Sequence, residues 1–385
     1  MQFGFSTANS IFFGPGCADE FAQDISRLGC RVFLLVGSDP RRFSHILDQL
    51  TSSETTCEVF RIIGEPTTDI AQAAVISARR AQSQAVIAVG GGSVIDVGKV
   101  VAAMLTNEGE LFDYLEVVGA GKHLREPPVP YFALPTTAGT GAEVTRNAVL
   151  RVPEHRVKVS MRSPLLLPGT ARVDPLLTHS MPPQLTASTG LDALTQLIEP
   201  FVSNKANPLT DGVCREGLHR AGRSLRRAFR DGNDAQARED MAIASLFSGL
   251  ALANAALGAV HGFAGPLGGM TDAPHGAICG KLLPYVIETN VRALQARAPD
   301  SPALARLDEA AQILTGRTTA RASDATSWIQ DLCAEFALPG LSAYGLRRED
   351  LPAVAAQARK ASSMKGNPIE LHDDELIAVL EKAMA

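Results

Sequence analysis

Short apolar runs alternate with amphipathic stretches over the first half of the chain. Three runs, residues 31–36, 85–89 and 131–134, are almost wholly apolar and end at turns rich in glycine, proline or hydroxyl groups. Such runs are typical of parallel strands buried on both faces. Other predicted strands lie near residues 11–13, 58–62 and 157–160, and predicted helices span 18–28, 43–51, 68–81 and 94–104. This alternation predicts an α/β domain built on a doubly wound parallel sheet.

The second half has a different period. Apolar residues recur at helical spacing and no strand-like alternation is left. Glycine and proline mark the boundaries between the stretches. The pattern predicts an all-helical domain, with the division between the two domains near residue 180. The predicted helices span residues 185–200, 208–230, 234–256, 261–270, 276–296, 302–315, 321–336, 348–361 and 373–384.

Composition narrows the class of protein. The chain has 385 residues, 45% of them hydrophobic, and a net charge of −5, which suits a globular enzyme of two domains. The densest basic cluster, between Arg220 and Arg230, has the spacing of one solvated helix face, so we expect no nucleic-acid partner. Six scattered cysteines without a CxxC pair indicate reduced thiols. The apolar runs are too short to span a membrane and no signal peptide is recognisable, so we expect a cytoplasmic protein.

A glycine-rich turn follows the predicted strand 85–89. It consists of Gly90, Gly91, Gly92 and Ser93 and leads directly into a helix. Free backbone amides and the helix dipole make such a turn an anion site, although it is not a GxGxxG fingerprint. The alternative is a tight turn that binds no ligand.

Hydroxyl groups gather after the strand 131–134. Thr136, Thr137 and Thr140 lie within a run that also holds two glycines, at the strand end where ligands of open α/β sheets bind. These hydroxyls suit ribose or phosphate oxygens, and Lys158 suits a pyrophosphate. The alternatives are an ordinary polar turn and a solvated lysine.

The helix predicted over residues 185–200 carries polar residues within an apolar stripe. Asp192 and Gln196 are four residues apart, so they leave the helix on one face. A buried acid is costly unless it is paired or binds a cation. His261 and His275 lie in apolar, glycine-rich stretches that can fold over this face, which makes these four residues a candidate metal site. The alternative is a helix-surface aspartate with two core histidines.

These stretches together resemble the iron-containing (group III) alcohol dehydrogenase family, which is related in fold to glycerol dehydrogenase and dehydroquinate synthase. No single segment is decisive, but the set follows the family order over nearly the whole chain. The matching segments are Gly90–Asp96 with Lys99, Leu134–Thr145, Leu167–Pro168, Val173–Pro175, Ala187 to Thr195, Ala206–Pro208, Pro274–Gly276 and Asn367–Pro368.

The resemblance implies a dehydroquinate synthase-like architecture, with a dinucleotide-binding α/β domain over residues 1–180 and a helical metal and substrate domain over residues 181–385. It places the active site in the cleft between the domains and implies a homodimer. A nicotinamide cofactor would lie over the Gly90–Ser93 loop with Asp96, and over the Thr136–Thr140 loop. An Fe²⁺ or Zn²⁺ ion would be held by one aspartate and three histidines, of which Asp192, His261 and His275 match.

The chain departs from the family at two positions. Gln196 stands where the third histidine ligand is expected, and its neutral amide oxygen is a weaker donor than imidazole for Zn²⁺ or Fe²⁺. Gly265 replaces a further family histidine, which removes a candidate proton-relay group and enlarges the space beside His261. The sequence therefore leaves open both a weakened metal site and a metal-free one.

The resemblance implies hydride transfer between NAD(P)H and a small alcohol/aldehyde or ketone pair. A metal would polarise the substrate oxygen; without it, His261 or His275 would act as general acid or base. The two departures favour a polar or acidic substrate over ethanol.

The sequence leaves open the choice of cofactor and two alternative functions. In the turn after the second strand, Asp39 would favour NAD if it faces the ribose. If Ser38 faces the ribose instead, with Arg41 or Arg42 beside it, the turn would favour NADP, and we favour NADP(H). A lyase of the dehydroquinate synthase type and a catalytically silent nucleotide-binding protein are the alternative functions.

Overall fold

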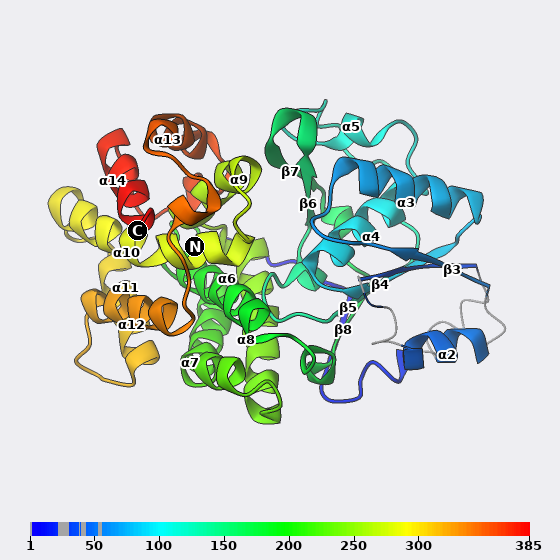
Figure 1. Ribbon diagram of the computed structural model, residues 1–385, viewed down its shortest axis with the longest axis horizontal. Coiled ribbons are helices and arrows are strands. Elements are labelled where there is room, and N and C mark those ends of the chain that lie inside the picture. The colour runs from blue at the N-terminus through cyan, green and yellow to red at the C-terminus, as the bar shows by residue number, and fades with distance from the viewer. Residues whose placement is uncertain (1, 22–30, 38, 40–43, 53–55) are drawn as a thin grey trace. The chain divides into compact units, whose positions relative to one another are not determined.

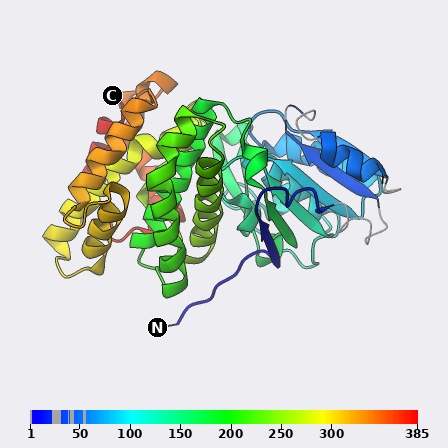
Figure 2. The ribbon, with the colours of Figure 1, turned by 90° about the horizontal axis from the view of Figure 1, so that it is seen from below.

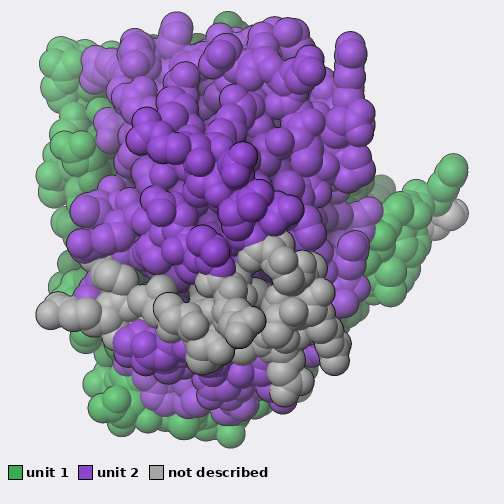
Figure 3. All heavy atoms as spheres, turned by 90° about the vertical axis from the view of Figure 1, so that its right-hand side faces the viewer, with its two compact units in different colours: residues 1–5, 138–140, 180–385 green, residues 6–137, 141–179 purple. Residues whose placement is uncertain are grey.

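The computed structural model of the protein describes residues 2–21, 31–37, 39, 44–52 and 56–385 (Figure 1). The chain forms two compact units, which Figure 3 distinguishes by colour. One unit comprises residues 6–137 and 141–179, and the other comprises residues 180–385 together with residues 138–140 and the first five residues. Most of the helix predicted over residues 18–28 lies outside the described residues.

The first unit is built on a parallel sheet. Within the described residues, six strands pair in the order β1-β8-β5-β4-β2-β3, and every pair is parallel. A separate antiparallel hairpin joins β6 (Asn147–Val152) to β7 (Val157–Arg162). The sheet strands are β1 (Ser10–Phe13), β2 (Val32–Val36), β3 (Cys57–Arg61), β4 (Ala85–Gly90), β5 (Tyr131–Pro135) and β8 (Thr170–Val173).

Both faces of this sheet are buried, which explains the nearly continuous apolar runs in its strands. Phe33 and Leu35 of β2 belong to the core under α3 and α4, whereas Leu34 belongs to a second core with Ile46 of α2. Figure 1 shows α3 and α4 on one face of the sheet and α2 on the other. The predicted doubly wound sheet is confirmed. Its helices are α2 (Ser44–Ser52), α3 (Thr68–Arg80) and α4 (Gly92–Met104), and α5 (Leu111–Tyr114) is a single turn.

The order of the strands creates a topological switch point in the sheet. β3 lies on one side of β2 and β4 lies on the other, so the chain leaves β2 in one direction and returns in the opposite one. In open α/β sheets the crevice at the carboxyl ends of such strands is where ligands bind. The loops after β2, β4 and β5 share this edge because all three strands are parallel neighbours.

The second unit is all-helical, as predicted. Helices α6, α7 and α8 lie side by side (Figure 2). α6 is buried along most of its length, so its polar residues need partners inside the unit. The helices are α6 (Pro183–Val202), α7 (Pro208–Arg230), α8 (Ala235–Ala255), α9 (Ala259–Met270), α10 (His275–Arg297), α11 (Pro302–Thr315), α12 (Ala322–Glu335), α13 (Leu351–Lys360) and α14 (Asp373–Ala383).

In the described part of the chain, no single helix is long and apolar enough to cross a membrane. The pair α8 and α9 reaches that length and hydropathy only when taken together, and the two are bent by 102° relative to one another.

Candidate metal centre and cofactor loops

Three polar residues of α6 face one region of the helical unit. Asp192, Gln196 and Glu199 are spaced by four and then three residues, which places them on one side of the helix. All three are buried, with between 2% and 4% of each residue exposed. Burial at this level requires hydrogen bonds or a bound cation.

Glu199 positions the first histidine of the cluster. Its Oε1 accepts a hydrogen bond of 2.7 Å from the backbone amide of Val260, in the first turn of α9. Its Oε2 lies 2.6 Å from Nδ1 of His261. The carboxylate therefore holds the start of α9 and fixes the imidazole so that Nε2 faces Asp192.

The second histidine comes from α10, which packs very closely on α6. An added Cβ at Gly276 would lie 1.8 Å from the carbonyl oxygen of Ser188, and one at Gly280 would lie 2.6 Å from the side chain of Leu191. Only glycine permits this approach at the two positions. The close packing brings His275, the first residue of α10, beside Asp192.

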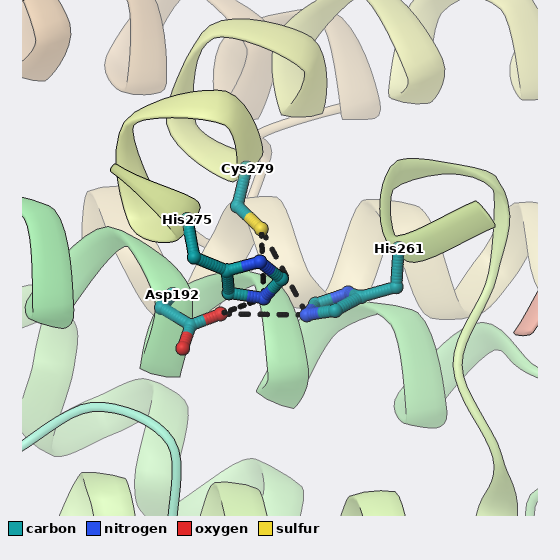
Figure 4. Close-up of side chains that lie close together, drawn as sticks. All are labelled: Asp192, His261, His275 and Cys279. Atoms are coloured by element: carbon teal, nitrogen blue, oxygen red, sulfur yellow. Dashed lines mark hydrogen bonds and ion pairs between the residues drawn. The ribbon is translucent and has the colours of Figure 1, made fainter. Parts of the chain in front are cut away.

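Four side chains meet at this point (Figure 4). Oδ1 of Asp192 lies 3.4 Å from Nε2 of His261 and 3.5 Å from Nε2 of His275. The fourth member is Cys279, one turn after His275 on α10, whose Sγ lies 3.8 Å from each of the two nitrogens. One ligand atom from each residue lies within 4.8 Å of all the others.

The electrostatics of the cluster favour charged forms of its acids. Burial acts to raise the pKa of Asp192, but the two histidines and a hydrogen bond from the amide of Gln196 outweigh it and lower that pKa. Burial also acts to raise the pKa of Cys279, and the histidines reverse this shift as well. The pKa values of His261 and His275 are raised, because the thiolate and the carboxylate outweigh the opposing effect of burial.

The donor set fits a divalent metal ion. Carboxylate oxygen, imidazole nitrogen and thiolate sulfur are the zinc ligands of proteins, and Fe²⁺ accepts the first two as well. The carboxylate of Glu199 behind His261 is the kind of outer partner that metal-bound histidines have. These residues would hold the ion that the resemblance implies.

Gln196, the fourth ligand predicted from the sequence, lies next to the cluster and is bonded to other groups. Its amide donates to the carboxylate of Asp192. Its Oε1 lies 3.3 Å from the hydroxyl of Ser248 on α8.

Two residues of the cluster are missing from the sequence-based site. Cys279 had a signal, since it follows His275 by one helical turn on the same face, but a lone cysteine without a CxxC partner is more often a small apolar residue of the core. Glu199 follows Asp192 by seven residues, or two turns, and is likewise an acid within an apolar stripe.

The predicted cofactor loops lie at the carboxyl edge of the sheet. The Gly90–Ser93 turn follows β4 and opens α4, with Gly91 at its N-cap. The amide of Thr136 donates to the carbonyl of Gly90 at 2.9 Å, and a Cβ on Gly91 would lie 3.2 Å from Thr137. The two loops are thus side by side. Thr140 belongs to the short segment 138–140 of the helical unit.

Asp96 and Lys158, two of the charged residues predicted to bind the cofactor, have protein partners. Asp96 accepts a 3.0 Å hydrogen bond from the amide of Val149 in β6 and lies 3.4 Å from Nζ of Lys99. Lys158 pairs with Glu65 at 2.6 Å.

The turn after β2 is described in part. Asp39 is half-buried, and Ser38, Arg41 and Arg42 lie outside the described residues.

Two sequence models match nearly the whole chain. The model described as iron-containing alcohol dehydrogenase matches residues 8–175, and the model of the C-terminal part of the Fe-containing alcohol dehydrogenase family matches residues 186–384.

Similar proteins extend over the same length. The 1,3-propanediol dehydrogenase of Klebsiella pneumoniae is 34% identical over 393 residues, which covers 99% of each chain. A crystal structure of a 1,3-propanediol oxidoreductase superposes with a TM-score of 0.90 at 33% identity and covers 100% of both chains. The sulfoacetaldehyde reductase of Bifidobacterium kashiwanohense, in complex with NAD⁺, superposes with a TM-score of 0.87 at 29% identity, over 100% of this chain and 99% of that one.

Proposed function

Because this chain belongs to the iron-containing alcohol dehydrogenase family, we propose that its buried side-chain cluster and its strand-end loops serve one reaction. The chain is an oxidoreductase of the alcohol dehydrogenase and aldehyde reductase class. The proposed reaction is hydride transfer between NAD(P)H and the carbonyl carbon of a small aldehyde or ketone, with the alcohol as product. The observation that carries it is the meeting of Asp192, His261 and the partly exposed His275, from three helices, at one point of the helical unit.

The protein groups have separable tasks. Asp192, His261 and His275 would hold a divalent metal, which supplies Lewis acidity that polarises a substrate oxygen. Glu199 accepts from Nδ1 of His261, which would leave Nε2 of that ring as the nitrogen that binds the ion. The Gly90–Ser93 turn offers free amides at the N-terminus of α4 to a cofactor phosphate, and Thr136 and Thr137 add hydroxyls beside it. The alternative mechanism predicted from the sequence uses no metal: His261 or His275 would hydrogen-bond directly to the substrate oxygen and act as general acid or base.

NADP(H) is the cofactor we propose. The argument rests on Arg41 and Arg42, which follow the turn after β2 and would attract a 2′-phosphate. Asp39 in the same turn would instead repel it. The ratio of kcat/KM for NADPH and NADH tests this proposal, and the variant R41A should lower that ratio if the arginine contacts the phosphate.

The substrate class that we propose rests on the two positions, Gln196 and Gly265, at which the chain departs from the family pattern. Gly265, one turn after His261 on α9, has no atom within 4 Å of where a Cβ would lie, so the space around the missing side chain is open. We propose a polar or acidic aldehyde that uses this space, in a cytoplasmic homodimer. The lyase and silent-binder alternatives fit less well than the oxidoreductase, since the family match spans both halves of the chain.

The test is an assay on protein purified without chelator or affinity-tag metal. Metal content is measured by plasma mass spectrometry, and NAD(P)H oxidation is followed with a panel of neutral and acidic aldehydes before and after chelation. We expect turnover that is lost on chelation, restored by Zn²⁺ or Fe²⁺, and lost in D192N. The exposed control D300N should keep full activity. Cofactor binding without turnover on any aldehyde, with metal added, would overturn the proposal.

A further inference from the structure

We propose that the fourth protein ligand of the metal is the thiolate of Cys279, and that Gln196 is a positioning residue for Asp192. This inference rests on the proposed metal-dependent function and changes its ligand set. It makes the site one of aspartate, two histidines and cysteine, which is suited to zinc.

Four of the six distances between ligand atoms in the cluster are close to those of a tetrahedral zinc site. Zn–N and Zn–O bonds of about 2.0 Å and a Zn–S bond of about 2.3 Å place neighbouring N and O ligands about 3.3 Å apart, and N and S ligands about 3.6 Å apart. The two measured O–N distances are 3.4 and 3.5 Å, and the two S–N distances are both 3.8 Å. These four distances between ligand atoms therefore lie within about 0.2 Å of the values expected around a bound zinc ion.

The surroundings of Cys279 differ from those of a structural buried thiol. Cys333, on the neighbouring α12, donates to the carbonyl of Gly280 at 3.4 Å. Among the described residues, the polar groups in contact with Cys279 Sγ are the two imidazole nitrogens. Its sulfur points into the cluster (Figure 4), at the position where a ligand is needed.

The hydrogen bond from Gln196 to Asp192 turns the Gln196 amide oxygen away from the cluster, which argues against Gln196 as a metal ligand. A carboxylate only accepts hydrogen bonds, so the amide nitrogen of Gln196 must face Asp192. The amide oxygen then points away from Asp192, toward the hydroxyl of Ser248 at 3.3 Å, which also lies 3.2 Å from the carbonyl of Gly139 and 2.8 Å from that of Ser245. Turning the amide oxygen toward a metal would give up the bond to the carboxylate.

A Cys279 thiolate in place of the neutral Gln196 amide changes both the net charge of the ligand set and the softness of one donor atom. Asp192 and the Cys279 thiolate together carry two negative charges, which match a divalent cation. With Gln196 as the ligand, Asp192 would be the only anionic group in direct contact with the ion. Thiolate is also the softest donor of the set, and it favours Zn²⁺ over Fe²⁺.

The experiment reads the metal–sulfur bond directly. X-ray absorption at the zinc edge of the wild-type holoenzyme should show one sulfur at about 2.3 Å. The Co²⁺-substituted protein should show a near-ultraviolet sulfur-to-cobalt charge-transfer band. Both signals should disappear in C279S and remain in Q196A and in the matched buried-cysteine control C333S. Competition with a chromophoric chelator should give a zinc Kd raised at least about 100-fold in C279S, and about 10-fold in Q196A.

The outcomes separate this inference from the proposed function. A wild-type metal shell of nitrogen and oxygen alone, with metal-dependent turnover, would overturn the thiolate ligand and leave the function standing. Turnover without any bound metal would also overturn it. Neither metal nor turnover would overturn both. The wild-type spectra decide the question even if C279S fails to fold.

Discussion

Oε2 of Glu199 lies 2.6 Å from Nδ1 of His261, while Oε1 of the same carboxylate accepts from the amide of Val260. One buried side chain thus secures both the backbone at the start of α9 and the orientation of the imidazole next to it. Because Nδ1 donates to Glu199, Nε2 is the ring nitrogen that faces Asp192 and would be available to an ion.

Replacing Glu199 should weaken metal binding without removing a ligand. In E199Q the amide cannot accept from both the Val260 amide and His261 Nδ1 as the carboxylate does, so we expect the zinc Kd to rise about 10- to 100-fold. Chelator competition measures it. The control is E288Q. Glu288 lies on α10 in a partly exposed ion pair with Lys382 of α14, and this variant should bind zinc as the wild type does. Equal affinity in E199Q would contradict the role given to Glu199.

The pH dependence of stability should reflect Glu143, which is buried in the 3-10 turn Ala142–Val144. Burial raises the pKa of Glu143 from 4.5 to about 7. Between these values the folded carboxyl keeps a proton that the unfolded chain has lost. Its contribution is therefore full below pH 4.5 and is lost as the pH rises through 7.

The loss amounts to about 3 kcal/mol of unfolding free energy. Urea unfolding of the sheet unit at pH 5 and pH 8 measures it. E143Q should be the more stable protein at pH 8 and should show a smaller drop between the two pH values. The exposed control E154Q should behave like the wild type, and an unchanged pH profile in E143Q would refute the assignment.

Asp240 of α8 ties α7 to α8 through a shared carboxylate. It is fully buried and accepts from Arg220 at 2.9 Å and from Arg223 at 2.6 Å. Burial acts to raise the pKa of Asp240, but Arg223 and the hydroxyl of Ser224 outweigh it and lower that pKa. Its contribution is present above the ordinary pKa and is lost as the pH falls through the lowered one.

Removing that charge should deprive Arg220 and Arg223 of the carboxylate that they share. We expect D240N to lose about 3 kcal/mol of unfolding free energy at pH 7. E216Q breaks the partly exposed contact of Glu216 with the same Arg220 and should cost less than about 1 kcal/mol. Thermal unfolding of both variants shows which of them loses more unfolding free energy. Equal losses in D240N and E216Q would mean that the burial of Asp240 does not matter.

The strand-end loops can be tested with two glycines of the sheet unit. In G91A the new methyl group, at the N-cap of α4, would lie 3.2 Å from Thr137 and would narrow the gap between the two loops. We expect the KM for NAD(P)H to rise about 10-fold with little change in thermal stability. Gly169 precedes β8 at the opposite edge of the sheet, and an added Cβ there meets its nearest atom at 3.5 Å. G169A should therefore leave KM unchanged; equal effects in both variants would disprove the placement.

Much of the fold was predictable because buried strands and amphipathic helices have clear periods. β2, β4 and β5 are apolar on both faces, and each predicted helix after residue 200 lies within a few residues of an observed one. β8 has no such signal, since it has four residues and carries Arg172, which is buried and donates to the carbonyl of Cys17. A short strand with a buried arginine does not look apolar.

The candidate site was predictable only in part, because distances between helices are absent from a linear pattern. Asp192, His261 and His275 stood out by residue type. Cys279 and Glu199 acquire their meaning from the packing of α10 and α9 against α6. That packing depends on Gly276 and Gly280, whose close contacts with α6 no spacing rule specifies.

Asp192, His261 and His275 come from α6, α9 and α10, which are far apart along the chain. An ion held by them would act as a cross-link among three helices, so its binding energy is also folding energy for the helical unit. At a free metal concentration 100 times the Kd, this linkage adds about 2.7 kcal/mol of stability. A chelator would then do more than abolish activity, because it would also lower the melting temperature of the helical unit. Protein purified in the presence of a chelator would be less stable for the same reason.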